Sequence, residues 1–385
     1  MTRPATSRPF LEELHRGLSA PICLTWELTY GCNLACIHCL SSSGRRDARE
    51  LTTAEATGFL DELAAMRVFY VNLGGGEPTL RPDFTDLVEH AIGHGVGVKF
   101  STNGTTLSPE RARRYAAMDY LDIQISLDGA RPESNDLVRG PGSYAAARRA
   151  MENLAGAGFS KFKVSVVVTR HNAGELDELV ELAGRHGAEL RLTRLRPSGR
   201  GARSWDELRP SPAQLAGVHR FLVEHPDVLT GDSFFHLAPL GDEPLPGLNL
   251  CGAGRVVCLV DPVGDVYACP FAMHPEFKAG SVRAPGGFAG VWRTSGLFGS
   301  LRQPQAAGAC NACGAYAACH GGCMAAKFFT GLPLDGPDPE CVLGHGEAAL
   351  SAVPLGARPE VAAGHSKPAA DGSPPVAVAL GATRR

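Results

Sequence analysis

The sequence predicts an α/β fold in which parallel strands alternate with helices, followed by an irregular region rich in cysteines. Between residues 22 and 195, short apolar segments alternate with longer segments whose apolar residues recur at helical spacing. Strands that alternate with helices in this way pair in parallel through right-handed crossovers. Beyond residue 251, turn-forming residues and clustered cysteines replace this alternation. The 385 residues are enough for a barrel-sized domain and a smaller one.

Six segments are predicted to be strands: Ile22–Leu28, Val68–Leu73, Gly97–Thr102, Tyr120–Ser126, Phe162–Val168 and Glu189–Leu195. Five helices are predicted between them: Thr53–Met66, Pro82–Gly93, Pro109–Met118, Ser143–Gly156 and Ala173–Gly187. Pro82 and Pro109 suit the first turn of a helix, and Gly93 and Gly187 suit its end. Because the carboxyl ends of parallel strands meet at one edge of a sheet, we expect the functional residues to gather there.

Four regions are predicted along the chain: an arm at 1–20, the strand–helix region with a bridge at 21–230, the cysteine-rich region at 231–348, and a tail at 349–385. The bridge contains a predicted helix, Pro212–Glu224, and the cysteine-rich region a predicted hairpin, Val256–Val260 and Val266–Cys269. That region otherwise has too few apolar residues for its own core, so we expect metal to stabilise it. The Ala/Pro/Gly-rich tail is expected to be disordered.

The composition disfavours several classes of protein. A formal net charge of −3 predicts no binding to nucleic acid. No apolar segment reaches the length of about 18 residues that a membrane span needs, and residues 1–21 lack the apolar centre of a secretory signal. We therefore expect a cytoplasmic protein with no membrane partner, in which clustered cysteines indicate metal binding or catalysis rather than disulfides.

Three cysteines with the spacing C-x-x-x-C-x-x-C, Cys32, Cys36 and Cys39, follow the first predicted strand. Iron–sulfur cubes normally take four cysteines, so a triplet leaves one iron without a protein ligand and predicts that a reactant binds there. The alternative is a zinc site completed from elsewhere, for example by His38. A second motif, Gly74-Gly75-Gly76-Glu77-Pro78, ends the second strand, where glycines let a ligand approach the backbone closely.

Together, the two motifs resemble the radical S-adenosylmethionine (SAM) superfamily, whose fold is a partial (β/α)6 TIM barrel. The resemblance implies that Cys32, Cys36 and Cys39 bind a [4Fe-4S] cluster and that SAM chelates its open iron. It implies these cofactor contacts: Gly75, Gly76, Glu77 and Pro78 for the amino group, Ser126 and Asp128 for the ribose, Ser101 and Asn103 in the pocket, and Arg139 for the carboxylate. His38 stands where the family usually has Tyr or Phe and keeps a flat ring for the adenine. Reduction of the cluster would then cleave SAM to methionine and a 5′-deoxyadenosyl radical, which abstracts a hydrogen atom from the substrate.

Eight further cysteines follow in the C-terminal region, and their spacing resembles the SPASM extension of peptide-modifying radical SAM enzymes. The resemblance implies two auxiliary [4Fe-4S] clusters, three clusters in all. One would use Cys251, Cys258, Cys269 and Cys323, and the other Cys310, Cys313, Cys319 and Cys341. Many relatives lack Cys258, and without it the first auxiliary cluster would have an open iron. A zinc knuckle is the alternative, but it leaves four cysteines unexplained. The twelfth cysteine, Cys23, is predicted to be an inert strand residue.

Segments outside these motifs resemble the mycofactocin radical maturases, over residues 20–348. They include Pro21–Thr29, Val68–Pro78, Val98–Gly104, Arg191–Arg200, Gly231–Leu237 and Met324–Gly336. The resemblance implies that the C-terminal tyrosine of a precursor peptide ending in Val-Tyr is oxidatively decarboxylated to an unsaturated tyramine. A carbon–carbon bond to the penultimate valine would then form a lactam. The implied partners are the precursor peptide, a flavodoxin- or ferredoxin-like electron donor and a separate peptide-binding chaperone, since only about twenty residues precede the first strand.

The tyrosine carboxylate must be held before it is expelled, and candidates for this role are Arg194, Arg196, Arg200, Asp232 and His236. The alternative enzyme is an anaerobic sulfatase maturase or another SPASM peptide-modifying enzyme. From a different class, a ferredoxin-like electron carrier or a zinc-bound interaction module would also carry clustered cysteines.

Overall fold

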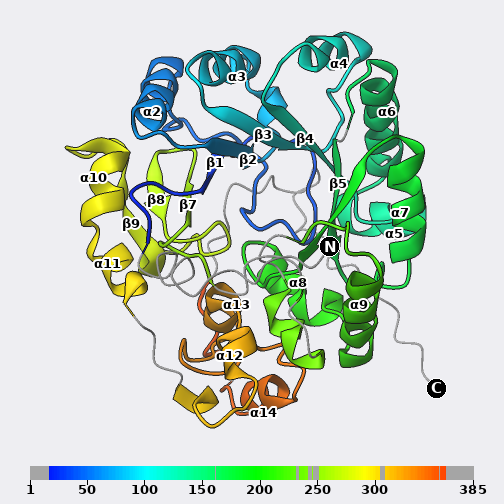
Figure 1. Cartoon of the computed structure of the whole chain (residues 1–385), viewed down its shortest axis with the longest axis vertical. Helices are drawn as coiled ribbons and strands as arrows, with labels where there is room; N and C mark the ends of the chain where they lie inside the picture. Colours follow the sequence, from blue (N-terminus) through cyan, green and yellow to red (C-terminus); the bar gives the residue numbers. More distant parts are fainter. Residues whose placement is uncertain are drawn as a thin grey trace, which may run out of the picture.

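The computed structural model describes residues 17–160, 162–230, 234–241, 245, 251–303, 308–354 and 356–360. Its centre is a nine-stranded sheet in the order β6-β5-β4-β3-β2-β1-β7-β8-β9. The strands are β1 Cys23–Thr29, β2 Tyr70–Gly75, β3 Gly97–Thr102, β4 Leu121–Ser126, β5 Lys163–Val168, β6 Glu189–Arg194, β7 Val257–Val260, β8 Asp265–Tyr267 and β9 Lys278–Ser281. In the described residues β6 and β9 are the two edges, so the sheet curves into a partial barrel without closing (Figure 1).

The first six strands are parallel and lie in chain order, which confirms the predicted α/β sheet. Their bounds lie within two residues of the predicted ones. Alternation along each strand separates two faces. In β1, the side chains of Leu24, Trp26 and Leu28 are fully buried in the core beneath the helices, whereas Thr25 and Glu27 face the inside of the barrel. The inner face is therefore available for polar side chains.

Helices cover the outer face of the parallel strands (Figure 1). Those that the sequence predicts are α2 Thr53–Ala65, α3 Phe84–Gly93, α4 Pro109–Ala116, α6 Ser143–Gly156, α7 Leu176–Arg185 and α9 Pro212–Glu224. Helix α3 begins two residues later than predicted, because Pro82 and Asp83 form a turn in which the Asp83 carboxylate binds Arg81 and Thr53. Helix α7 begins three residues late, because the Asn172 side chain accepts a hydrogen bond from the Thr169 amide and forms a turn there.

The structure also contains short elements that the sequence reading does not predict. They are α5 Pro132–Arg139, α8 Gly201–Leu208, α10 Gly287–Thr294, α11 Gly296–Arg302, α12 Tyr316–Cys319, α13 Met324–Phe329 and α14 His345–Ser351, with 3-10 turns η1 Pro78–Leu80, η2 Phe235–Leu240, η3 Pro275–Phe277 and η4 Gly308–Cys310. Most are one or two turns long, too short for a helical repeat of apolar residues to stand out in the sequence.

The C-terminal region extends the barrel sheet. Strand β7 pairs in parallel with β1, and β7 and β8 form the predicted hairpin. The expectation of too few apolar residues for a core is wrong, because Phe288, Trp292 and Phe298 are fully buried in the core of the barrel itself. The ring centroids of Phe59 on α2 and Phe288 on α10 lie 5.7 Å apart. This region therefore shares a core with the barrel and does not need its own.

The chain beyond residue 348 is ordered at its start. Helix α14 extends into the predicted tail, and Arg358 Nη1 lies 2.6 Å from Asp206 Oδ2. Predicted disorder is therefore wrong for this part, and the rest of the tail from residue 361, like residues 1–16 of the arm, lies outside the described residues. None of the helices in the described ranges combines the length and the apolar character needed to cross a membrane.

We predict that Phe288→Ala destabilises the protein by about 3–5 kcal/mol, the usual cost of removing a buried aromatic ring. The residue is fully buried between the barrel and the C-terminal region. The matched control is Phe69→Ala, whose ring is 80% exposed and whose loss should change the free energy of unfolding by no more than about 0.5 kcal/mol. Anaerobic urea titration of both variants measures the difference. Equal effects of the two substitutions would contradict the shared core.

Candidate functional site

A cavity of about 580 Å³ occupies the inner face of the barrel. All six parallel strands contribute alternate side chains to its walls. These are Thr25 and Glu27 from β1, Asn72 from β2, Lys99 and Ser101 from β3, Gln124 and Ser126 from β4, Ser165 and Val167 from β5, and Arg191 and Thr193 from β6. These side chains offer charges and hydrogen-bonding groups to a ligand within a lining that also has much apolar surface.

Cys32, Cys36 and Cys39 lie on the loop after β1, and all three line the cavity. Burial raises the pKa of the Cys32 thiol to about 12, and the neighbouring cysteines and Glu77 add to this rise. Burial also raises the pKa of Cys36. Thiols with such values stay protonated near neutral pH unless a cation stabilises the thiolate. The donor set therefore fits a metal centre whose positive charge would hold these sulfurs ionised.

The separation of the sulfurs disfavours a single zinc ion at any cysteine group. Among the described residues, which include all twelve cysteines, no three cysteine sulfurs lie within 4.8 Å of one another. Zinc–sulfur bonds of about 2.3 Å in a tetrahedron would place the sulfurs about 3.8 Å apart. In an iron–sulfur cube each thiolate binds a different iron, so the sulfurs lie farther apart. The zinc alternative consequently loses support at the triplet and at the C-terminal cysteines.

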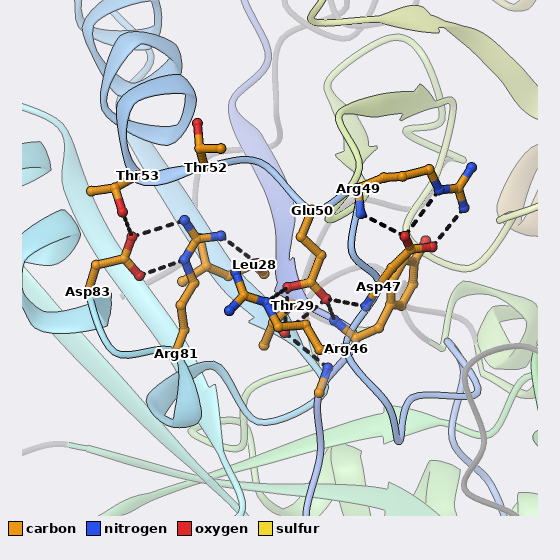
Figure 2. A network of polar contacts seen from close by, with 12 residues as sticks. Leu28, Thr29, Arg46, Asp47, Arg49, Glu50, Thr52, Thr53, Arg81 and Asp83 are labelled. Carbon is orange, nitrogen blue, oxygen red and sulfur yellow. Dashed lines mark hydrogen bonds and ion pairs between the residues drawn. The ribbon is translucent and has the colours of Figure 1, made fainter.

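One buried carboxylate closes the loop that carries the triplet. Glu50 accepts hydrogen bonds from the Thr29 hydroxyl at 2.9 Å, the Tyr30 amide at 2.8 Å and the Asp47 amide at 3.2 Å (Figure 2). It also pairs with Arg46 Nε at 2.9 Å. Thr29 and Tyr30 begin the loop and Asp47 ends it, so Glu50 holds the two ends of the loop together. The sequence reading misses this residue, because its partners become visible only in the folded loop.

A second polar contact ties the same strand end to the helices (Figure 2). The buried guanidinium of Arg81 donates to the carbonyl of Leu28 at 3.2 Å and pairs with Asp83 at 2.6 Å. Thr53, at the start of α2, donates to the same Asp83 carboxylate at 2.7 Å. The end of β1, from which the cysteine loop departs, is therefore held by α2 and by the turn before α3.

The glycine motif packs directly against the cysteine loop. A Cβ atom at Gly76 would lie 2.1 Å from the carbonyl oxygen of Gly31, and one at Gly75, whose φ is +111°, would lie 2.5 Å from that of Thr29. Gly75 and Gly76 line the cavity, as do the predicted contacts Ser101, Asn103 and Ser126. These glycines therefore bring the backbone of β2 next to the triplet, where a side chain would not fit.

Glu77 and Pro78, by contrast, do not line the cavity in the described structure. Glu77 is buried and accepts hydrogen bonds from the Asn103 amide and the Thr102 hydroxyl, both at 2.7 Å. Pro78 starts the turn η1. Glu77 thus fixes the backbone of the loop after β3 by these hydrogen bonds and thereby positions Asn103 at the cavity wall.

Asp128, His38 and Arg139 form a buried group beside the triplet. Asp128 Oδ2 lies 2.9 Å from His38 Nε2 and 2.7 Å from Arg139 Nε, and Oδ1 accepts the Val167 amide at 2.7 Å. Although burial opposes ionisation, the charges of Arg139 and His38 lower the pKa of Asp128 well below its usual range. His38 and Arg139 line the cavity but Asp128 does not. In this structure Asp128 therefore orients the ring of His38 and the guanidinium of Arg139. A ligand carboxylate, the predicted partner of Arg139, would share that guanidinium with Asp128.

The arginines predicted to hold a substrate carboxylate already have partners. Arg194, Arg196 and Arg200 all line the cavity, so their role as substrate contacts stays a prediction. Arg194 already donates to Asp338 at 2.5 and 2.8 Å and to Glu340 at 2.5 Å, so it would have to share these partners with a substrate. Arg200 donates to the carbonyls of Cys36 at 3.0 Å and Ser43 at 2.7 Å and so supports the cysteine loop.

The remaining candidates for that role differ in their surroundings. The Arg196 guanidinium stacks 3.7 Å above the ring centroid of Phe271. His236 is buried, and burial, followed by the charge of Arg194, keeps its pKa well below the ordinary value, so its ring is neutral. The prediction for Asp232 lies outside the described residues.

The C-terminal cysteines fall into two groups by the charges that act on them. Burial raises the pKa of Cys310 and of Cys319, and the nearby Cys313 and Cys341 raise both values further. Burial also raises the pKa of Cys269, to which Cys251 and Cys323 add. Cys258 belongs to neither group. It is fully buried in β7, burial raises its pKa, and the ionisable side chains that act on it besides are those of Cys23 and Arg302. Asp338 links the second group to the barrel, since it accepts the Cys323 amide at 2.7 Å while binding Arg194.

Sequence reasoning missed three charged residues inside the barrel, Glu27, Lys99 and Arg191. Burial, with a smaller contribution from the Asp261 charge, raises the pKa of Glu27 to about 8, so this acid is mostly protonated at neutral pH. Burial and then repulsion by Arg191 lower the pKa of Lys99 to about 8. The sequence could have revealed these three residues, because each is a charged residue at an inward-facing position of an otherwise apolar strand.

Comparisons with known proteins agree with the fold and the site. Residues 26–183 match the radical SAM superfamily. The mycofactocin maturase MftC of Mycobacterium ulcerans (strain Agy99) is 64% identical over 353 residues, which cover 91% of this chain and 96% of the relative. The crystal structure of Streptococcus suis SuiB bound to S-adenosylmethionine has a TM-score of 0.69 at 18% identity, covering 88% of this chain and 83% of that one. SuiB bound to its precursor peptide SuiA has a TM-score of 0.66 at 18% identity, covering 84% and 79%.

We predict that Glu50→Ala loosens the cysteine loop while leaving the barrel folded. The substitution leaves a hydroxyl and two amides without their buried acceptor, at a cost of about 1–3 kcal/mol each. Hydrogen–deuterium exchange of peptides covering residues 30–47 should become at least about tenfold faster. The control is Glu181→Ala, which removes a carboxylate that is 73% exposed on α7. Unchanged exchange in the Glu50 variant would show that other contacts hold the loop.

Proposed function

The chain belongs to the mycofactocin maturases, a family of radical SAM enzymes, and we propose that it decarboxylates and cross-links the C-terminus of a precursor peptide. Members of this superfamily use SAM and a [4Fe-4S] cluster. The proposed substrate ends in Val-Tyr. Its tyrosine would become an unsaturated tyramine, which would then be joined by a carbon–carbon bond to the valine to form a lactam.

The observation that carries this proposal is the placement of three thiols, rather than four, at one end of the cavity inside the barrel. Cys32, Cys36 and Cys39 share the cavity with the inward-facing residues of six strands. Cys23 also lines it, but at the start of β1, among Tyr70 and Lys99 at the other end of the strands. A cube on the triplet would therefore keep one iron open toward the space where a substrate fits.

The residues around the triplet have chemistry that suits SAM. Backbone carbonyls near Gly75 and Gly76 would accept the amino group, Ser101, Asn103 and Ser126 would bind polar groups of the nucleoside, and Arg139 would bind the carboxylate. Glu77 and Asp128 would act indirectly, by positioning Asn103 and Arg139. When bound, the cluster and SAM supply a 5′-deoxyadenosyl radical that abstracts a hydrogen atom. The protein would orient the peptide and exclude water from the barrel.

The proposed reaction removes a hydrogen atom from Cβ of the terminal tyrosine. Breakage of the bond between Cα and the carboxylate carbon then releases CO₂ and forms the Cα=Cβ double bond. One electron is left over, so the reaction needs a one-electron acceptor close to the cavity. The C-terminal cysteines are candidates to hold that acceptor, because Phe271, two residues after Cys269, lines the same cavity.

We propose two auxiliary [4Fe-4S] clusters, for a total of three. Cys310, Cys313, Cys319 and Cys341 would hold one of them. Cys251, Cys269 and Cys323 would hold the other, with an open iron, since the neighbours of Cys258 are Cys23 and Arg302. A peptide-binding chaperone and a flavodoxin- or ferredoxin-like electron donor remain expectations drawn from the family.

The reaction is tested by anaerobic incubation of the enzyme with SAM, reductant and a synthetic precursor ending in Val-Tyr, with and without a chaperone from a related gene cluster. We expect the peptide to lose CO₂ and two hydrogens in mass spectra, in step with 5′-deoxyadenosine formation. The triple variant with Cys32, Cys36 and Cys39 changed to Ala should abolish both products. A peptide oxidised without loss of CO₂ would instead indicate a sulfatase maturase-like reaction.

The redox role of the C-terminal cysteines makes a separate prediction. Cys310→Ala should leave the thermal unfolding of the barrel and the peptide-independent cleavage of SAM intact but reduce peptide decarboxylation at least about tenfold, because the leftover electron loses its path onward from the cysteine group nearest the cavity. The control is Cys23→Ala, a cysteine outside both groups. Full decarboxylation by the Cys310 variant would show that this cysteine group stabilises the fold only.

A further inference from the structure

Three side chains on the outer face of the barrel have the composition of a metal site. His90 and His94 lie one helical turn apart at the end of α3, and Asp61 lies on the neighbouring helix α2. One possible ligand atom from each residue lies within 4.8 Å of the other two. Among the described residues, no other group of three His, Cys, Asp or Glu side chains comes this close together. None of the three lines the cavity, so the group is separate from the candidate site.

A hydrogen bond fixes which nitrogen of His94 can bind a metal. Nδ1 of His94 lies 2.8 Å from the carbonyl oxygen of His90. Because a carbonyl oxygen only accepts, Nδ1 carries the hydrogen, and the lone pair of the neutral ring is on Nε2. Histidines that bind metals through one ring nitrogen typically donate the other to a backbone carbonyl or a carboxylate. The ring of His94 is therefore oriented as a metal ligand would be.

The other two side chains lie close enough to share one ion. Nε2 of His90 lies 2.7 Å from Oδ1 of Asp61. A zinc ion with bonds of about 2.0–2.1 Å to both atoms would hold them about 3.3 Å apart in a tetrahedron, so a shift of about 0.6 Å admits it. The rings of His90 and His94 are stacked, with their centroids 4.1 Å apart and their planes at 28°, which keeps the second imidazole beside the first.

The surroundings favour a divalent cation that prefers nitrogen ligands. Both histidines belong to the end of α3, where the free carbonyls of the helix attract positive charge. The side chain of Asp61 is 54% exposed and that of His90 25%, so water can complete the coordination. Two imidazoles and one carboxylate suit zinc, whereas magnesium and calcium prefer oxygen ligands alone.

We propose that Asp61, His90 and His94 bind a zinc ion that joins α2 to α3 on the outside of the barrel. The two helices are already joined near their first turns, where Thr53 of α2 donates to Asp83 before α3 at 2.7 Å (Figure 2). The ion would add a second link about two turns farther along both helices. The inference does not depend on the proposed reaction, because none of the three ligands faces the cavity.

The test titrates the full-length, anaerobic holoenzyme with Zn²⁺ in competition with a chromophoric chelator. We expect the wild type to bind one zinc ion more per chain than His90→Gln or His94→Gln does. Asp61→Asn should weaken this binding at least about tenfold, since even the outer partner of a metal ligand contributes that much to affinity. Iron and sulfide are counted before and after each titration, so that zinc that displaces iron from the cysteines is recognised and subtracted.

Hydrogen–deuterium exchange tests the link between the helices. With zinc at ten times its Kd, amides of residues 84–96 that exchange when the end of α3 opens should be protected about tenfold in the wild type. The same segment of His90→Gln should exchange at one rate with and without zinc.

The matched control is His225→Gln. Nδ1 of His225 also lies near a carbonyl one turn back, that of Phe221 at 3.0 Å, and its Nε2 lies 3.8 Å from Asp177. No third ligand among the described residues completes a group there, so this variant should bind zinc as the wild type does. Equal zinc binding by the wild type and His90→Gln overturns the proposal, as does an equal loss in His225→Gln. Zinc that leaves exchange of residues 84–96 unchanged in the wild type contradicts the link between α2 and α3.

Discussion

The candidate site depends on buried carboxylates that accept hydrogen bonds from the backbone of the loops around it. Glu50 is the most important of them, because it joins the two ends of the cysteine loop through the amides of Tyr30 and Asp47. Glu77 acts in the same way on the amide of Asn103, and Asp128 on that of Val167. Charge-assisted bonds of this kind are short and strong, and they hold loops that have little apolar surface of their own. The geometry of the triplet thus follows from acids that do not themselves face the ligand.

The two ends of the cavity differ in charge. At the carboxyl edge of the strands, Arg139 is paired with Asp128, and three thiols provide sulfur ligands for a positively charged metal centre. Deeper in the barrel, Lys99 on β3 and Arg191 on β6 line the cavity. Arg194 connects the C-terminal region to the barrel, because it links the end of β6 to the segment that contains Cys323 and Asp338.

Local features of the sequence were enough to predict the six parallel strands and the loop on which the triplet lies. Apolar periodicity and the spacing of Cys32, Cys36 and Cys39 are both properties of short segments. Interactions between distant segments could not be predicted in this way. Arg194 and Asp338 are 144 residues apart, so the sequence could not show that this strand-end arginine forms an internal ion pair. Similarly, the apolar residues of the C-terminal region seemed too few for a core because the sequence does not show that Phe288 packs against Phe59 of α2. Lys99 and Arg191 lie on β3 and β6, which are not neighbours in the sheet, and only the curvature of the barrel brings them to one cavity.

The central claim is that the iron left open by the cysteine triplet binds SAM. Electron–nuclear double resonance on the reduced, anaerobic enzyme tests it directly, with SAM labelled with 17O in the carboxylate and 15N in the amino group. The account predicts hyperfine coupling of both labels to the cluster on Cys32, Cys36 and Cys39. A cluster signal that SAM leaves unchanged, with no coupling to either label, would show that a fourth protein ligand occupies the iron and would contradict the account.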